Sequence, residues 1–543
     1  MAIAGRRNPR LFAFLYPLVI LGSAAAVVFL GLYAIDYRNA VTDKGFFSLL
    51  IAFDPETLQN ALGNMAQTVA AVLGIVITVV SIVVQLAATR YAPRIAEMFF
   101  RDRTNIAVLS FFVVACINVG WVSVSVMGTN GAVPSFVPQV SVVVSMFLVT
   151  FSLLLMVPYF AYVFDFLDPD RVVGRIQQQA VDSAAGTAAA RGAAGVGDRQ
   201  RNALTGIEQL SDIAVNAVSQ KDKAIASGAI DAVKDLVVTY LGKKPAIAKE
   251  WFVIGGWLRQ NPDFVSLAGE SIDDLAEQRV WLEWKALRQY QAIYNESLGE
   301  MQDINHLIAI NTRYIGEAAL KAKDEHAIAL SVKFFNTYMR ATINKQQVRT
   351  AYNVLNQYRQ LAESAIAAGE TQRVREIGFY FKYYGQIAHG LDLGFVTETV
   401  AYDMATLCEH SFTARSPAHD EVLKLLLELD KEPENENASQ SQEHMLRGVR
   451  KAQAKLASFY LAAGPTGEPF ARLIFSDMKD ERSERLSSIR DELLNIKSKD
   501  FWEVIDRGTN FDYVDNARKA QLVVFFSWFP ALSERRVSDA TTT

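Results

Sequence analysis

The chain has 543 residues, of which 51% are hydrophobic and 21% charged, and its formal net charge is −4. No strongly basic domain is present, so we expect no nucleic-acid partner. Cys116 lies in an apolar run and Cys408 in a charged region, which excludes a disulfide scaffold. Residues 1–170 contain only nine Lys/Arg and nine Asp/Glu, about half the density of charged residues in the chain as a whole. This distribution indicates an apolar part followed by a water-soluble part.

Four apolar stretches are long enough to cross a bilayer, which takes about 20 mainly apolar residues. They are residues 11–35, 62–89, 104–128 and 138–164. The first also resembles a signal peptide, because arginines precede it and "SAAA" is similar to a cleavage site. Its apolar run continues through "VVFLGLYAI", however, which favours a retained anchor. We therefore predict a four-helix transmembrane domain over residues 1–170.

Positive charge distinguishes the two sides of these spans. Nine Lys/Arg flank one side, whereas the opposite loops contain only Arg38 and Lys44. Because Lys and Arg accumulate in cytoplasmic loops, both termini of this multi-pass membrane protein are predicted to be cytoplasmic. The turn between the second and third spans is then basic and faces the lipid headgroups. Its arginines are Arg90, Arg94, Arg101 and Arg103. A topology signal is the favoured interpretation of this turn, and specific lipid binding is the alternative.

The second span carries a polar pattern that a lipid-facing helix does not need. Asp54 can cap this helix and Pro55 suits its first position. From residue 57 to residue 88, every third or fourth residue is small or polar, whereas the other positions between 69 and 87 are Val, Ile, Leu or Ala. This spacing keeps the polar residues on one face of a gently supercoiled helix. We call the following residues the seam: Asn64, Gln67, Gly74, Thr78, Ser81 and Gln85.

Three interpretations of the seam remain open. Small residues allow close helix packing, and Thr, Ser and Gln can donate hydrogen bonds across such a contact. Alternatively, symmetric copies of the helix could turn the seam towards a shared, water-filled axis that conducts ions. In the third interpretation, the seam is buried and moves in a sensor. The seam contains no charged residue, which argues against a proton relay.

The stretch that follows the seam resembles a known family. Three short motifs are similar to motifs of the bacterial membrane proteins grouped as domain of unknown function 2254. They are Val84–Ala87 ("VQLA"), Pro93–Arg94 and Arg101–Arg103. "GIEQLSDIAVNAVS" at 206–219 looks like that family's first cytoplasmic helix. This chain then has "QKDKAIA" where the family usually has an Asn-Asp-Pro phrase. The resemblance implies a four-span membrane protein with a cytoplasmic domain, and it implies no established activity.

The remaining two thirds of the chain show helical periodicity almost throughout. Residues 171–199 are predicted to prolong the fourth helix and then form a Gly-rich linker. A cytoplasmic helical domain follows over 200–430, and a C-terminal helical region with a disordered tail over 431–543. Recurrent helix pairs suggest a solenoid-like array, although the sequence contains no strict repeat. The fold class is therefore all-α.

No catalytic motif occurs in the sequence, so we expect no enzyme, no cofactor and no metal site. Cys408 and His410 form the one Cys/His pair, which is a weak metal signal. We predict an oligomeric, channel-like inner-membrane protein with a conduction path along the second span and a regulatory helical domain. The lipid bilayer, other copies of the chain and ions are its expected partners. The alternative is a non-conducting scaffold or signalling protein whose helical domain binds partner proteins.

Overall fold

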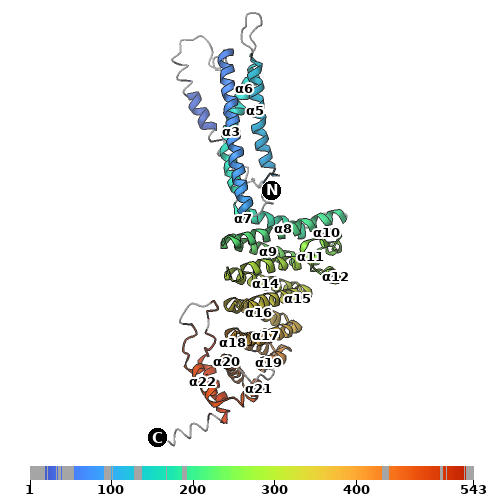
Figure 1. Ribbon diagram of the computed structural model, residues 1–543, viewed down its shortest axis with the longest axis vertical. Helices are drawn as coiled ribbons and strands as arrows, with labels where there is room; N and C mark the ends of the chain where they lie inside the picture. The colour runs from blue at the N-terminus through green and yellow to red at the C-terminus, as the bar shows by residue number, and fades with distance from the viewer. Residues whose placement is uncertain are drawn as a thin grey trace, which may run out of the picture. The chain divides into compact units, whose positions relative to one another are not determined.

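The computed structural model describes most of the chain and divides it into two compact units, residues 1–175 and 176–543. The described residues are 19–20, 22–31, 34, 38, 54–90, 99–100, 102–126, 137–166, 168–185, 193–430, 440–501, 506–508, 510–530 and 532. For residues 87–90, 166, 193–194 and 440–445 only the backbone is described. Within these ranges all regular secondary structure is helical (Figure 1), so the predicted all-α class is confirmed.

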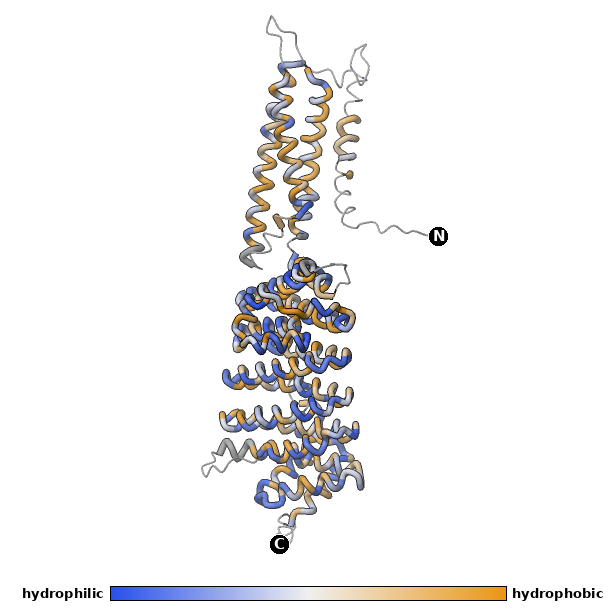
Figure 2. Tube along the Cα trace, turned by 90° about the vertical axis from the view of Figure 1, so that its right-hand side faces the viewer, coloured by the Kyte–Doolittle hydropathy of each residue, from blue (hydrophilic) through white to orange (hydrophobic). Residues whose placement is uncertain are grey.

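Unit 1 contains three described helices that are long and apolar enough to span a membrane (Figure 2). They are α3 (Pro55–Arg90), α5 (Arg103–Ser125) and α6 (Gln139–Phe166). These helices match the predicted second, third and fourth spans to within a few residues, except that α3 begins earlier. The predicted first span, 11–35, is described only in part, as a short apolar helix at Gly22–Gly31 with a few residues beside it, and the rest of the span lies outside the described residues.

Helix α3 begins where the capping signals predict. The Asp54 carboxylate accepts hydrogen bonds from the Thr57 backbone N–H at 3.0 Å and from the Thr57 hydroxyl at 2.8 Å. Along the helix, large aliphatic residues pack against α5 and α6, for example Val80 near Phe112 and Tyr159. In a bilayer such contacts stabilise the bundle mainly through close packing, because lipid tails are as apolar as the side chains themselves.

The segment between the units differs from the predicted helix extension and linker. α6 ends at Phe166, and a separate helix, α7 (Pro169–Ala185), begins at a proline that has no N–H to continue the earlier helix. Asp168 caps it by accepting the Asp170 N–H at 3.0 Å. α8 (Ala193–Ser219) already begins inside the expected linker, and Arg199 donates to the Ser183 carbonyl at 2.9 Å. The predictions of a continuous fourth helix and of a linker reaching residue 199 were therefore wrong.

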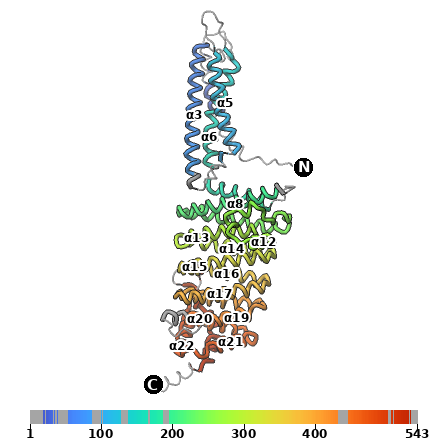
Figure 3. Tube along the Cα trace, turned by 45° about the vertical axis from the view of Figure 1, so that its right-hand side comes forward, coloured from blue at the N-terminus to red at the C-terminus, as the bar shows by residue number. Residues whose placement is uncertain are grey.

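Unit 2 is built from two layers of stacked helices (Figure 3). The first layer contains α8, α13 (Trp281–Ser297), α15 (Glu325–Asn344), α17 (Thr371–Gly390) and α19 (His419–Leu427). The second layer contains α9 (Lys223–Lys243), α14 (Gln302–Ala322), α16 (Val348–Ala368), α18 (Gly394–Thr413) and α20 (Gln440–Ala462). Each helix packs on its neighbours in its own layer, and consecutive helices from α8/α9 to α17/α18 form hairpins. This is the predicted solenoid-like arrangement.

The repeat is structural rather than a repeat of residues. The first-layer helices α13, α15, α17 and α19 begin at residues 281, 325, 371 and 419, which gives spacings of 44, 46 and 48 residues. Five short elements interrupt the array between α9 and α13: η1 (Lys244–Ala246), η2 (Lys249–Phe252), α10 (Gly256–Arg259), α11 (Pro262–Val265) and α12 (Gly269–Glu277). Lys285 of α13 holds this insertion, because its buried ammonium group lies 2.8 Å from Glu208 and 3.1 Å from Asn261.

Seven turns between helices share one backbone conformation. In each turn a left-handed residue follows the helix, and the next N–H donates to the carbonyl five residues earlier at 2.8–3.1 Å. This is the Schellman motif, which satisfies carbonyls left over at the helix end. The left-handed residues are Lys221, Arg279, Lys323, Gln346, Gly369, Asp392 and Arg415. Because six of the seven are not glycine, the usual sequence signal for this helix end is nearly absent.

The C-terminal part of unit 2 closes the second layer. η3 (Gly464–Thr466), α21 (Glu468–Met478), α22 (Ser483–Asn495) and α23 (Asn516–Ser527) follow α20. α21, α22 and α23 all pack against α20, so these helices cover the end of the stack. The predicted disordered tail lies outside the described residues.

Candidate functional site

Helix α3 has two different faces. One face is buried against α5 and α6 and is purely aliphatic: Leu58, Leu62, Val69, Val76, Val80 and Val84. All six seam residues are exposed on the surface of the chain. Each helical residue turns the chain by about 100°, so Gly74 and Val76 point in nearly opposite directions. The seam is therefore not packed against the described spans of its own chain.

The exposed face has room for a close neighbour. A Cβ atom built on Gly74 would meet no atom of the chain within 4 Å. The Thr78 hydroxyl donates to the Gly74 carbonyl at 2.8 Å, so its own hydrogen bond is made within the helix. Large apolar residues flank the seam, with Ile75 55% and Ile82 53% exposed. Another helix could approach closely at Gly74 while these side chains pack around it.

Two serines of α6 show the opposite arrangement. Ser145 and Ser152 are fully buried, and the Ser145 hydroxyl donates to the side-chain amide oxygen of Asn118 at 3.3 Å. The outward residues of these two helices are mostly large and apolar, such as Trp121 and Val140, which are 74% and 79% exposed. Among the three described spans, α3 is thus the one that presents a continuous polar face outward.

A polar cluster that the sequence analysis missed joins the start of α5 to the end of α6. Tyr162 donates to Asp102 at 2.5 Å, and Tyr159 donates to the buried side chain of Asn105 at 2.7 Å. Burial raises the pKa of Asp102, but hydrogen bonds from Tyr162 and Thr104 outweigh it and hold the pKa below its usual value. The position of Asp102 just before an apolar helix is the one signal that could have indicated this cap.

The predicted basic turn is described only in part. Arg103 is exposed at the first position of α5. Arg90 ends α3, and its side chain is not described, whereas Arg94 and Arg101 lie outside the described residues. The lipid-facing role of this turn therefore stays a prediction.

The Cys/His pair of unit 2 does not form a site. Cys408 is fully buried, and burial raises the pKa of its thiol, whereas His410 is exposed near Glu363. A different histidine is buried nearby, because the ring of His419 lies 2.7 Å from the Tyr460 hydroxyl. Among the described residues no group of three His, Cys, Asp or Glu could hold a metal ion.

The N-terminal part of the chain matches a known protein family. Residues 11–205 match the family described as "Predicted membrane protein (DUF2254)". The resemblance carried by Val84–Ala87 and Arg101–Arg103 is thereby confirmed. The DUF2254 match covers unit 1 from residue 11, α7 and the first part of α8, and it ends before most of the helical stack.

Two further comparisons add no function to the DUF2254 match. No curated protein matches this chain. One solved structure is similar, a "Circular tandem repeat protein with novel repeat topology and enhanced subunit contact surfaces". It is 13% identical, and the alignment covers 72% of this chain and 93% of that one at a TM-score of 0.30.

Proposed function

We propose that this protein is an oligomeric, channel-like protein of the bacterial inner membrane, with both termini in the cytoplasm. In this proposal α3 helices from several copies surround a shared axis, and their seams line a path for ions. Unit 2 is a cytoplasmic domain that regulates or assembles the path, and the protein is not an enzyme. The nine-to-two distribution of Lys and Arg supports this orientation.

One observation carries the proposal, namely that all six seam residues are exposed on their own chain. A stripe of amide and hydroxyl groups facing hydrocarbon would leave polar groups without water, whereas a polar seam facing an axis keeps them hydrated. Polar rings can replace part of the hydration shell of an ion, and apolar rings can close a path by dewetting.

The second candidate function is a non-conducting scaffold or signalling protein. The Thr78 bond to Gly74 favours it, because a threonine whose hydroxyl is satisfied within its helix tolerates a dry interface. In that case the seams pack against one another without a water path, and unit 2 binds partner proteins.

Cysteine accessibility distinguishes the two candidates. Single cysteines at Thr78, Ser81 or Gln85 should react with a small aqueous thiol reagent when a conducting state is present. Matched cysteines at Val76, Val80 or Val84 lie on the buried face and should react more slowly. The background replaces Cys116 with serine and retains the fully buried Cys408.

Ion flux into liposomes provides the functional readout. Gln85→Leu should reduce the flux, because it replaces a polar ring with an apolar one. Ser81→Asp should shift the flux towards cations. Seam cysteines that are as unreactive as those at Val76, Val80 and Val84 in every condition would refute the channel and favour the scaffold.

A further inference from the structure

Between α22 and α23, residues 506–508 and 510–512 lie across three helices of the second layer. We call residues 506–512 the strap, of which 506–508 and 510–512 are described. It contacts α16, α18 and α20 through side chains that are more than 50 residues away in the sequence. The Asp506 and Asp512 side chains are 28% and 21% exposed, whereas the Arg507 side chain is only 6% exposed. Asp403, Tyr402 and Tyr352 beneath the strap are 2%, 4% and 7% exposed. The strap thus lies over residues of α16, α18 and α20 and contacts them mainly through side chains.

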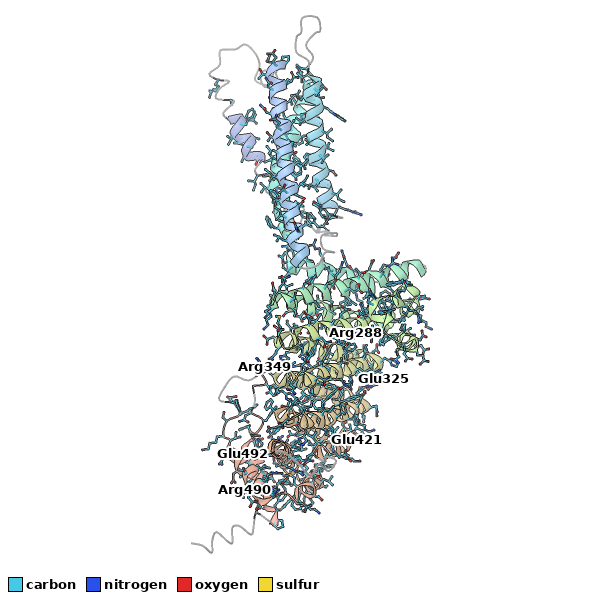
Figure 4. All side chains as sticks on the ribbon, in the orientation of Figure 1. Arg288, Glu325, Arg349, Glu421, Arg490 and Glu492 are labelled. Atoms are coloured by element: carbon cyan, nitrogen blue, oxygen red, sulfur yellow. The ribbon has the colours of Figure 1, made fainter. Side chains whose placement is uncertain are left out.

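The first contact is a carboxylate site at the start of α16. Arg349, labelled in Figure 4, donates to both carboxylate oxygens of Asp506 at 3.0 and 3.1 Å. Asn353, one helical turn later, donates to the same carboxylate at 2.9 Å. A two-point contact between a guanidinium group and a carboxylate fixes direction as well as charge.

The second contact is an arginine site on α18. Arg507 donates to both oxygens of Asp403 at 2.6 and 3.1 Å, and its guanidinium carbon lies 4.1 Å from the ring centre of Tyr352. Asp403 has a further cation, Arg359, at 3.1 Å. A buried carboxylate beside an aromatic face selects arginine over lysine, because the planar guanidinium group can bind and stack together.

The third contact accepts an aromatic ring and a second carboxylate. Phe511 stacks on Tyr402 with ring centres 4.9 Å apart and planes inclined by 13°. Asp512 lies 2.9 Å from Lys451, and Lys455 donates to the Phe511 carbonyl at 2.7 Å. Between the two halves of the strap, Gly508 has a φ of +64°, a left-handed conformation that glycine adopts without strain.

We propose that this face of α16, α18 and α20 is a peptide-binding surface and that the strap is its intramolecular occupant. The external ligand is a segment of a partner protein with the same order of side chains as the strap. A carboxylate residue is followed directly by an arginine, and after three further residues come an aromatic residue and a second carboxylate. The contacts are charge-assisted hydrogen bonds and ring stacking, and the one buried pair, Arg507–Asp403, is made by a single side chain of the strap. A segment with the same chemistry can therefore replace them one for one. Such exchange needs no repacking of the helical stack.

A synthetic peptide tests this proposal in the full-length protein. The fluorescent probe is the strap sequence 504–514, VIDRGTNFDYV. The double variant Arg507→Ala/Phe511→Ala should bind it at least about tenfold more tightly than the wild type, because a tethered strap competes at a high effective concentration. The matched control Arg490→Ala lies on α22, pairs with its neighbour Asp491, and should behave like the wild type. Adding Asp403→Asn to the double variant should abolish binding.

Two results with the folded double variant overturn the proposal. A folded double variant that does not bind the probe, or that binds a probe with alanine at position 507 equally well, would make the strap a structural clasp. If the double variant fails to fold, the wild type is photo-cross-linked with excess probe that carries a diazirine at position 511. Labelling on α16 or α18 supports exchange, and its absence refutes it. If wild-type protein alone displaces the probe, the occupant is a second copy, and the assignment to a partner protein is overturned.

Discussion

Gly467 shows how one missing Cβ atom allows two segments to meet. A Cβ at this position would lie 2.0 Å from the carbonyl oxygen of Tyr460, a backbone atom that cannot turn aside. The φ of Gly467 is −92°, which any residue can adopt, so the close approach alone requires glycine.

Gly467→Ala should therefore destabilise unit 2 by about 1–3 kcal/mol, the usual cost of overpacking. The matched control is Gly228→Ala in α9, where an added Cβ meets nothing within 4 Å. It should stabilise the protein by about 0.5–1 kcal/mol through helix propensity. Denaturant unfolding monitored by tryptophan fluorescence measures both, and equal midpoints for the two variants would contradict the argument.

His306 is a residue whose charge the fold disfavours. Burial lowers the pKa of its imidazole below 6.5, although Asp506 and Asp303 act in the opposite direction. A base with a lowered pKa takes up its proton more readily in the unfolded chain. Unfolding therefore becomes easier as the pH falls through about 6.5 and continues to do so down to the folded pKa.

The pH dependence of stability tests this residue. Between pH 7.5 and pH 5, the unfolding midpoint of the wild type should fall more steeply than that of His306→Gln. The glutamine keeps a polar group near Gln357, which lies 3.3 Å from the His306 ring. Parallel curves for the two proteins would show that His306 does not contribute to the pH dependence.

At the scale of elements, the seven Schellman turns set where the helices end. A non-glycine residue in the left-handed conformation destabilises the folded state by roughly 1–2 kcal/mol.

Gln346 is exposed and has a φ of +53°, so glycine should adopt the backbone conformation at this position with less strain. Gln346→Gly should raise stability by about 0.5–1 kcal/mol after the greater flexibility of glycine in the unfolded chain is subtracted. The control Asn344→Gly, in the last turn of α15, should lower stability, and a loss in both variants would contradict this assignment.

At the scale of the whole molecule, the proposed assembly predicts contacts through the outward face of α3. An added side chain at Gly74 meets nothing in its own chain, so Gly74→Leu should leave the subunit folded while it blocks the close approach of another helix. The oligomer measured by light scattering in detergent should then dissociate. Val114→Leu, at an exposed apolar position of α5, is the control and should assemble normally. Equal assembly of both variants would exclude the seam as the interface.

The sequence predicted the helices better than the way in which they connect. The caps at Asp54 and the apolar runs located α3, α5 and α6, because a span has strong length and composition requirements. The seam followed from its spacing, and the exposure of Gly74 and Ser81 agrees with a face that is free of the aliphatic packing. The break before Pro169 was missed because an apolar helix followed by an amphipathic one gives no sharp change in period.

The contacts of the strap could not be predicted from sequence. Arg349 and Asp506 are 157 residues apart, and Arg507 and Asp403 are 104 apart. No local period or motif relates residues at such separations; only the stacking of α16, α18 and α20 brings their partners to one face. The structural repeat was hidden for a related reason, because hairpins of 44–48 residues can keep their geometry with different side chains.

The stacking of hairpins in unit 2 has a consequence for how the chain unfolds. Where each hairpin touches only the next, the array behaves as a one-dimensional chain of coupled units, and unfolding can begin at either end and advance hairpin by hairpin. The strap breaks this rule, because it ties α16, α18 and α20 together with residues from beyond α22. The C-terminal half should therefore open as one cooperative block, while the hairpins before α15 open in sequence. When the stack is pulled from its ends, the hairpins before α15 should unfold one after another at low force. The block tied by the strap should then unfold in a single step at a higher force.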